Sequence, residues 1–187
     1  MKPTYEKVAA AIEEFGALQH PREALRLIEF LAPANPTLLI EVGVWRGGNA
    51  ALLKTFFPAL RVIGVDVLNV DSPEVSDPPS LRSNVERFGI EMVQGDTKSP
   101  DTVTQVRGMI GDRRADYVFI DASHDTDSVI ADFRLWSPLG VRTGFHDVHN
   151  PMVFAAWMQC TGLMEPNPRT FALWKETDGH GIGVVMT

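Results

Sequence analysis

An acid and several glycines follow an apolar run near the start of the chain. The run LLI leads directly into the stretch EVGVWRGG at 41–48. Glycines at the end of a buried strand let the backbone turn sharply and approach a ligand closely. The stretch is therefore predicted to be a cofactor-binding loop. Its candidate ligand-binding residues are Glu41, Gly43, Trp45 and Gly47.

Both common phosphate-binding patterns are absent from this stretch. A nucleoside triphosphate loop needs Lys and then Ser or Thr after G-x-x-x-x-G, but Asn49 and Ala50 follow Gly48. A dinucleotide loop needs a second glycine two residues after the first, where this chain has Trp45. The indole closes the approach to a pyrophosphate, so another kind of cofactor is expected.

Three acids stand at the ends of successive predicted strands. Glu41 ends the first, Asp66 ends the second with Val67 beside it, and Asp96 follows the third. A carboxylate about 20 residues past the glycine turn suits a ribose, because it accepts hydrogen bonds from two hydroxyls. Glu41 repels a pyrophosphate and favours a ligand with a free amino group. With Asp96 placed to read a purine edge, the pattern favours an adenosine that carries positive charge.

A second group of polar residues follows the fourth and fifth predicted strands. Either His124 or His146 is a candidate general base, because an imidazole titrates near neutral pH. By contrast, His20, His149 and His180 are expected to be surface or capping residues. The members of the group are Asp121, His124, Asp125, His146, Asp147 and His149.

Short runs rich in Val, Ile and Leu alternate with helical patterns over most of the chain. Such alternation is typical of a parallel sheet covered on both faces. Two helices within 1–34 precede it, and the runs 170–176 and 181–187 indicate a terminal antiparallel hairpin on one edge. We therefore predict one α/β domain over 1–187. The Pro- and Asp-rich loop at 71–80 is expected to be a lid or a solvated connection. The predicted strands are 38–42, 61–65, 90–94, 116–120 and a weak one near 142–147; the predicted helices between and after them are 49–57, 80–88, 99–110, 127–136 and 150–159.

The composition is that of an ordinary globular protein, with 44% hydrophobic and 22% charged residues. A net charge of −7 argues against a nucleic-acid partner, which normally requires clustered Lys and Arg. Neither a signal peptide nor a membrane span is indicated. The lone Cys160 cannot form an internal disulfide and is expected to be a small buried hydrophobe. We expect a cytoplasmic protein with no nucleic-acid or membrane partner.

The motifs resemble those of the S-adenosylmethionine (SAM)-dependent methyltransferases of the seven-stranded α/β fold. EVGVWRGG is similar to their first motif, VIGVD to their second and VQGD to the motif on the adenine side. The later segments FIDASHDTDSV and FHD resemble a subgroup related to macrocin O-methyltransferase and the cephalosporin hydroxylase-like proteins. The resemblance implies a Rossmann-like, doubly wound, mostly parallel seven-stranded sheet with a C-terminal antiparallel hairpin. It also implies methyl transfer from SAM to a small-molecule acceptor, most simply a hydroxyl.

The resemblance further implies a divalent ion. Carboxylates in the corresponding loops of related O-methyltransferases hold such an ion, which makes Asp121 and Asp147 candidate Mg²⁺ ligands and Asp121 part of the cofactor pocket. In His146 the chain departs from these relatives, which often have a carboxylate or amide there. Further departures are Thr126, where an aromatic residue is usual, and a shortened fifth strand. Part of the acceptor pocket is expected from the N-terminal helices or from the second subunit of a homodimer.

Other functions stay open at this level. The shortened fifth strand is compatible with a non-catalytic cofactor-binding or assembly protein, and the same fold also supports N-methylation. The sequence DPPS at 77–80 has part of a DNA amino-methylase motif, but it lacks the aromatic residue and follows the wrong strand. An α/β hydrolase or a reductase is disfavoured because neither G-x-S-x-G nor G-x-G-x-x-G occurs.

Overall fold

The computed structural model describes residues 2–68, 78–162 and 170–187. The loop expected at 71–80 lies mostly outside these residues, which include only its end from Pro78 onward. Within the described ranges, no helix is long and apolar enough to cross a membrane.

The described strands form a seven-stranded sheet in the order β3-β2-β1-β4-β5-β7-β6. Neighbouring strands from β3 to β5 run parallel, whereas β7 runs antiparallel to both β5 and β6. The predicted Rossmann-like, mostly parallel sheet with a terminal antiparallel hairpin is thus confirmed. The strands are β1 (Leu38–Val42), β2 (Arg61–Asp66), β3 (Glu91–Gln94), β4 (Tyr117–Ile120), β5 (Arg142–Phe145), β6 (Phe171–Trp174) and β7 (Ile182–Met186).

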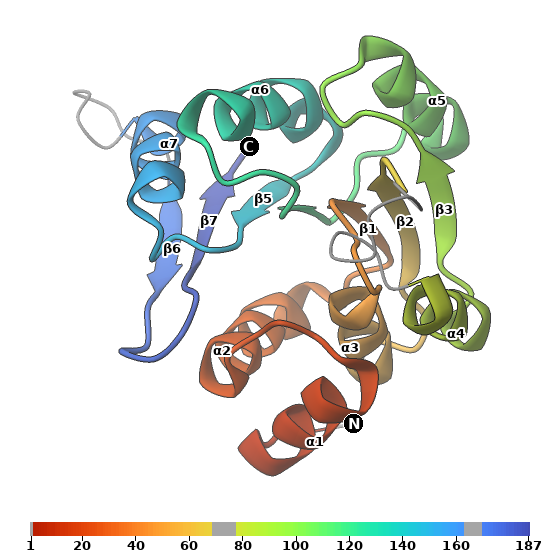
Figure 1. Ribbon diagram of the computed structural model, residues 1–187, viewed down its shortest axis with the longest axis vertical. Helices are drawn as coiled ribbons and strands as arrows, with labels where there is room; N and C mark the ends of the chain where they lie inside the picture. The colour runs from red at the N-terminus through yellow and green to blue at the C-terminus, as the bar shows by residue number, and fades with distance from the viewer. Residues whose placement is uncertain (1, 69–77, 163–169) are drawn as a thin grey trace.

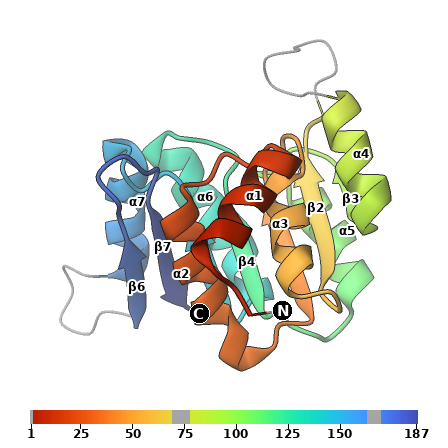
Figure 2. The same ribbon diagram turned by 90° about the horizontal axis from the view of Figure 1, so that it is seen from below.

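Helices cover both faces of the sheet (Figures 1 and 2). In Figure 1, α5 to α7 lie above it and α1 to α4 lie below it. Asn150 caps α7 through its side chain as its position predicts, whereas the side chain of Ser99 makes no capping hydrogen bond to α5. The α-helices are α1 (Tyr5–Phe15), α2 (Pro21–Leu31), α3 (Gly48–Phe56), α4 (Pro78–Phe88), α5 (Pro100–Ile110), α6 (Thr126–Trp136) and α7 (Pro151–Thr161), with short 3-10 turns at Ala32–Ala34 and Ser137–Leu139.

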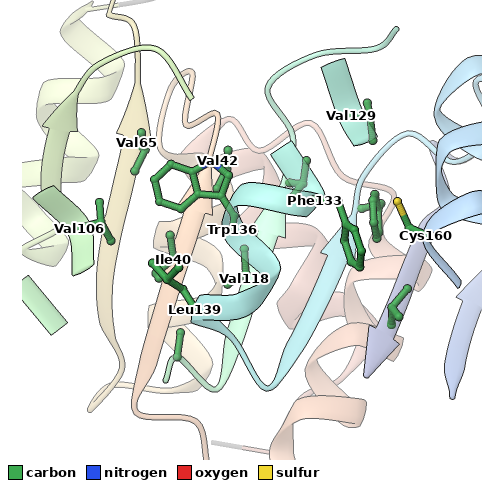
Figure 3. Packing of buried hydrophobic residues seen from close by; sticks show 14 of the residues in the cluster. Ile40, Val42, Val65, Val106, Val118, Val129, Phe133, Trp136, Leu139 and Cys160 are labelled. Atoms are coloured by element: carbon green, nitrogen blue, oxygen red, sulfur yellow. The ribbon is translucent and has the colours of Figure 1, made fainter. Parts of the chain in front are cut away.

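Each face of the sheet has its own hydrophobic core. Side chains alternate along a strand. Ile40 of β1 therefore belongs to the core between the sheet and α5 to α7, and Leu39 belongs to the core between the sheet and α1 to α3. Figure 3 shows the first of these cores, whose buried members include Ile40, Trp136 and Cys160. Burial on both faces explains why the strands are continuously apolar in the sequence.

The strand order reverses between β1 and β4. From β1 the chain proceeds outward through β2 to β3, and it then returns to the other side of β1 to begin β4. At such a switch point the connections leave in opposite directions and open a crevice at the carboxyl ends of the strands. The residues predicted to bind a cofactor lie at these ends.

Candidate active site

A cavity of about 660 Å³ lies at the carboxyl ends of β1 to β5. Most of the predicted site residues line it, and so does the connection between α1 and α2, the two N-terminal helices from which part of the acceptor pocket is expected. Its lining comes from the segments 16–19, 43–45, 66–67, 96–98, 121–124 and 146–147, and from Glu41, Gly48 and Asn49.

Glu41 is almost completely buried at the end of β1. Asn49 donates a hydrogen bond from Nδ2 to its Oε1 at 2.8 Å. Burial raises the pKa of the Glu41 carboxyl to about 8, against the hydrogen bond from Asn49, and the negative charges of Asp121 and Asp66 add to the rise. The sequence predicts a negative charge at Glu41, whereas burial keeps its carboxyl mainly protonated at neutral pH.

Gly43 lies where two strand ends come into contact. Its φ is +87°, and a Cβ atom added there would lie 2.4 Å from the carbonyl oxygen of Asp121 and 2.6 Å from the backbone nitrogen of Ala122. No larger residue fits this position, because the obstructing atoms are backbone. The glycine thus lets the loop after β1 pack against the loop after β4.

Asp66 holds the glycine loop in place. Its Oδ2 accepts hydrogen bonds from the backbone N–H groups of Val44 at 2.8 Å and Trp45 at 3.0 Å. Its Oδ1 accepts from the N–H of Leu68 at 2.9 Å. Trp45 has a φ of +47°, which is unfavourable for a bulky residue, so these bonds stabilise a strained turn. Sequence reasoning predicted a ribose ligand and missed this structural role.

The two glycines at the end of the loop have different neighbours. Gly47, predicted to contact the cofactor, is absent from the cavity lining; it directly precedes α3 with a left-handed φ of +70° and faces Asn84 of α4. A Cβ atom on Gly48 would lie 2.6 Å from the backbone nitrogen of Ala17. The small size of Gly48 therefore brings the connection between α1 and α2 to the cavity.

The loop after β3 forms another wall. Asp96 is exposed, and its Oδ1 accepts a hydrogen bond from the N–H of Lys98 at 2.9 Å. The neighbouring carbonyl oxygen of Thr97 accepts from Nε1 of the buried Trp136 at 2.8 Å. The loop is therefore anchored to α6. Val67, which follows the neighbouring strand β2, is 48% exposed and leaves an apolar surface free for a ligand.

A histidine and two aspartates meet after β4 and β5. Nδ1 of the buried His146 lies 3.2 Å from Oδ1 of Asp121 and 3.2 Å from Oδ2 of Asp147. Burial acts to lower the pKa of His146, but the two carboxylates outweigh it and raise the pKa to about 10. Burial acts to raise the pKa of Asp147, but His146 and His124 lower it below its ordinary value. Without a ligand the cluster is an imidazolium between carboxylates.

Two further imidazoles contact Asp147. Nε2 of the exposed His124 lies 2.7 Å from Oδ2, and Nδ1 of His180 lies 3.1 Å from Oδ1. His180 is exposed, as expected for a surface residue. Its contact with Asp147 was not predicted, because the β6–β7 turn brings it to the site from far along the sequence. His149 does take a structural position, since its Nδ1 contacts the carbonyl oxygen of Gly179 at 2.5 Å.

The cluster has the donor atoms of a metal site. In the described part of the chain, one ligand atom from each of three residues lies within 4.8 Å of the others in two overlapping sets. Carboxylate oxygens and imidazole nitrogens are both common ligands of divalent ions. The sets are Asp121, His124 and Asp147, and His146, Asp147 and His180.

Solved structures share this fold. The O-methyltransferase from Bacillus cereus, described in complex with SAH (S-adenosylhomocysteine), has a TM-score of 0.67 over 99% of this chain and 92% of its own, at 18% identity. The O-methyltransferase TomG from Streptomyces achromogenes, described in complex with SAM, has a TM-score of 0.61 over 97% of this chain and 88% of its own, at 16% identity. The chain therefore has the Rossmann-like methyltransferase fold.

The sequence match is more specific. A family model described as "Rhamnosyl O-methyltransferase/CmcI" matches residues 11–153, and the chain belongs to this family. Mycinamicin VI 2''-O-methyltransferase of Micromonospora griseorubida is 25% identical over 156 residues, which are 80% of this chain and 33% of that protein. The chain thus spans about a third of the length of this curated relative.

Proposed function

We propose that the chain is a SAM-dependent methyltransferase that acts on a hydroxyl group of a small molecule, such as a sugar. The observation that carries the proposal is one cavity lined both by the glycine loop and by the histidine–aspartate cluster. Its volume of about 660 Å³ lies within the range of small-molecule sites. The family and the named activity of the mycinamicin relative favour oxygen over nitrogen as the acceptor atom.

The cofactor lies along the ends of β1 to β4 in this proposal. Asp66 keeps lone pairs for the ribose hydroxyls after its bonds to the backbone, because a carboxylate has about four acceptor positions. A cationic group of SAM near Glu41 favours the ionised carboxyl. Gly47 acts indirectly, by turning the chain into α3. The proposed cofactor-binding residues are Glu41, Gly43, Trp45, Asp66, Val67, Asp96 and Asp121.

His124 is the stronger candidate for the general base. Nδ1 of His146 is not available for this role, because it lies between the carboxylates of Asp121 and Asp147, which raise the pKa of His146 to about 10. His124 lines the cavity, and its Nε2 can donate to Asp147, which leaves Nδ1 free to accept a proton. The acceptor hydroxyl gives its proton to His124 as its oxygen attacks the methyl carbon. The bond from this carbon to sulfur breaks, and neutral SAH is the product.

A divalent ion belongs to the same proposal. The oxygens of Asp121 and Asp147 are the ligand type that Mg²⁺ prefers, and both face the cavity. A bound ion would lower the pKa of an acceptor hydroxyl, which makes removal of its proton easier. The two aspartates hold the ion beside His124.

Calorimetric titration with SAM and SAH tests the cofactor. We expect saturable binding of both, weakened in Asp66→Ala, and no detectable binding by the wild type at millimolar ligand would overturn the proposal. Transfer of a labelled methyl group to hydroxyl and amine acceptors then separates O-methylation from N-methylation. Binding without transfer to any acceptor, unchanged by His124→Asn, would favour the non-catalytic alternative.

Two further expectations rest on the proposed function. We expect a cytoplasmic enzyme, since SAM is a soluble intracellular cofactor. We also propose that the protein is a homodimer, which size-exclusion chromatography with light scattering tests directly.

A further inference from the structure

We infer that His146, Asp147 and His180 form a site for a first-row transition ion such as Mn²⁺, Fe²⁺, Co²⁺ or Zn²⁺, in place of the Mg²⁺ that the resemblance to related O-methyltransferases implies. The inference deepens the proposed function, on which it rests, by naming the ion and by adding His180 as a ligand. His124 stays outside this ligand set and keeps its role as the base.

The spacing of the donor atoms fits one ion. Nδ1 of His146 lies 3.2 Å from Oδ2 of Asp147, and Nδ1 of His180 lies 3.1 Å from Oδ1 of the same carboxylate. Ligands about 2.1 Å from a common ion lie roughly 3.0–3.4 Å apart in octahedral or tetrahedral arrangements. The atoms therefore need only small shifts to share an ion.

The donor types select the class of ion. Mg²⁺ prefers oxygen ligands and usually keeps several waters, whereas imidazole suits Fe, Co, Ni, Cu and Zn. The two imidazole nitrogens of His146 and His180 and a carboxylate oxygen of Asp147 form a mixed set. Mixed nitrogen and oxygen ligands bind Mn²⁺, Fe²⁺, Co²⁺ and Zn²⁺ with affinities that rise along the first row.

A buried carboxylate fixes the position of His180. Glu23 of α2 is 0% exposed, and its Oε1 accepts a hydrogen bond from the N–H of Glu176 at 2.8 Å. Its Oε2 accepts from the N–H groups of His180 at 3.1 Å and Gly181 at 2.9 Å. Burial of a carboxylate is unfavourable unless such bonds compensate it. Glu23 is thus a positioning residue for the turn that carries His180.

The same turn is tied to the loop after β5. The N–H of His149 donates to the carbonyl oxygen of His180 at 2.9 Å, and the N–H of Val148 donates to that of Gly181 at 3.3 Å. Asp147, directly before this pairing, has a left-handed φ of +55°. The backbone therefore holds Asp147 and His180 in a fixed relation before any ion binds.

Titration of the chelator-treated full chain with Co²⁺ and Mn²⁺ tests the inference. We expect Co²⁺ to develop the visible absorption of a nitrogen- and oxygen-ligated ion, and Mn²⁺ binding to be detected by electron paramagnetic resonance. Both should persist in about a hundredfold excess of Mg²⁺. No binding at millimolar Co²⁺ and Mn²⁺, or equal displacement by Mg²⁺, would overturn the inference and leave a hydrogen-bonded network of imidazoles and carboxylates.

Variants assign the ligands. His180→Asn should weaken Co²⁺ binding at least about tenfold and shift its spectrum, and folding should tolerate the change because the side chain is 47% exposed. Asp112→Asn is the control; this exposed aspartate lies outside the cluster and outside the turn that carries His180, and its loss should change neither the Co²⁺ affinity nor the spectrum. Unchanged affinity in His180→Asn would exclude His180 as a ligand.

Glu23→Gln tests the positioning role. We expect Co²⁺ affinity to fall about tenfold while SAH affinity remains at the wild-type value, because the glycine loop is not touched. A variant that unfolds at a lower temperature but binds Co²⁺ normally would reduce Glu23 to a structural residue. SAH calorimetry separates the two proposals: SAH binding without metal binding refutes only the metal site, and metal binding without SAH binding refutes only the methyltransferase function.

Discussion

Nδ2 of Asn49 donates a hydrogen bond to Oε1 of Glu41 at 2.8 Å inside the buried end of β1, while Oε2 of Glu41 has no hydrogen-bond partner in the described part of the chain. An ionised carboxylate with one partner is unfavourable there, which accounts for its raised pKa of about 8. The chain thus keeps a proton at the start of its predicted cofactor loop.

This proton makes stability depend on pH. The carboxyl of Glu41 has an ordinary pKa of 4.5 in the unfolded chain and a pKa of about 8 in the folded protein, so between these values the unfolded state holds fewer protons. Rising pH therefore favours unfolding, by up to about 1.4 kcal/mol per pH unit. We expect the advantage of Glu41→Gln over the wild type in urea unfolding to grow from pH 5 to pH 8.

A difference between the two proteins that stays constant with pH would contradict the raised pKa. The same group offers a check on the cofactor. Binding of SAM near Glu41 should release a proton at pH 6 to 7, which calorimetry in buffers of different ionisation enthalpy detects. Glu41→Gln should abolish this release.

Gly43 is predicted to be irreplaceable. Alanine there places Cβ 2.4 Å from a backbone oxygen of Asp121 and is strained at a φ of +87°, so Gly43→Ala should cost at least about 3 kcal/mol of unfolding free energy and abolish SAH binding. Gly108 of α5 is the matched control. Nothing lies within 4 Å of its added Cβ, and Gly108→Ala should stabilise the helix by about 0.5–1 kcal/mol. Similar chemical denaturation curves for the two variants would refute the prediction.

Asp66→Ala should affect the protein even without cofactor. Removal of the carboxylate leaves the N–H groups of Val44 and Trp45 without their acceptor, and we expect a loss of about 2 kcal/mol in thermal or urea unfolding. Asp96→Ala, at an exposed loop acid, should leave stability nearly unchanged. If Asp66→Ala keeps the wild-type melting temperature and loses only SAM affinity, the carboxylate acts through the ribose alone.

Trp136 is predicted to support the cofactor from outside the cavity. Trp136→Phe removes the hydrogen bond to the carbonyl oxygen of Thr97 and leaves a small cavity, so we expect a loss of about 2 kcal/mol and SAH binding weakened several-fold. Trp157 is equally buried, but its Nε1 has no hydrogen-bond partner among the described residues. Trp157→Phe should therefore reduce stability without a change in SAH affinity. Equal effects on SAH affinity would show that the bond to Thr97 does not matter.

The fold was predictable because its signals are local. Apolar runs of strand length alternate with helical periodicity, and the position of Asn150 marks the start of α7. Even the weakly patterned run near 142–147 forms β5, although only Arg142–Phe145 are in the strand. Parallel strands end at the same edge of a sheet, so Asp66, Asp121 and Asp147 could be assigned to one site from sequence order alone.

What could not be predicted depends on contacts between distant segments. Glu23 and His180 are 157 residues apart, and neither has a neighbouring pattern that indicates the other. The approach of Ala17 to Gly48 likewise joins segments whose sequences show only a helix end and a glycine. The pKa of Glu41 was misjudged because the sequence reveals its charge type but not its burial.

The bonds between Glu23 and the turn at 176–181 also set an order of events during translation. Glu23 leaves the ribosome before its partners, which follow it by 153 to 158 residues. Until then the nascent protein can form the parallel strands and the glycine loop, but it lacks the turn that brings His180 to Asp147. A chain halted before this turn would thus have the predicted cofactor loop but would lack His180, one of the proposed metal ligands. The carboxylate of Glu23 would still be accessible to water or to a chaperone.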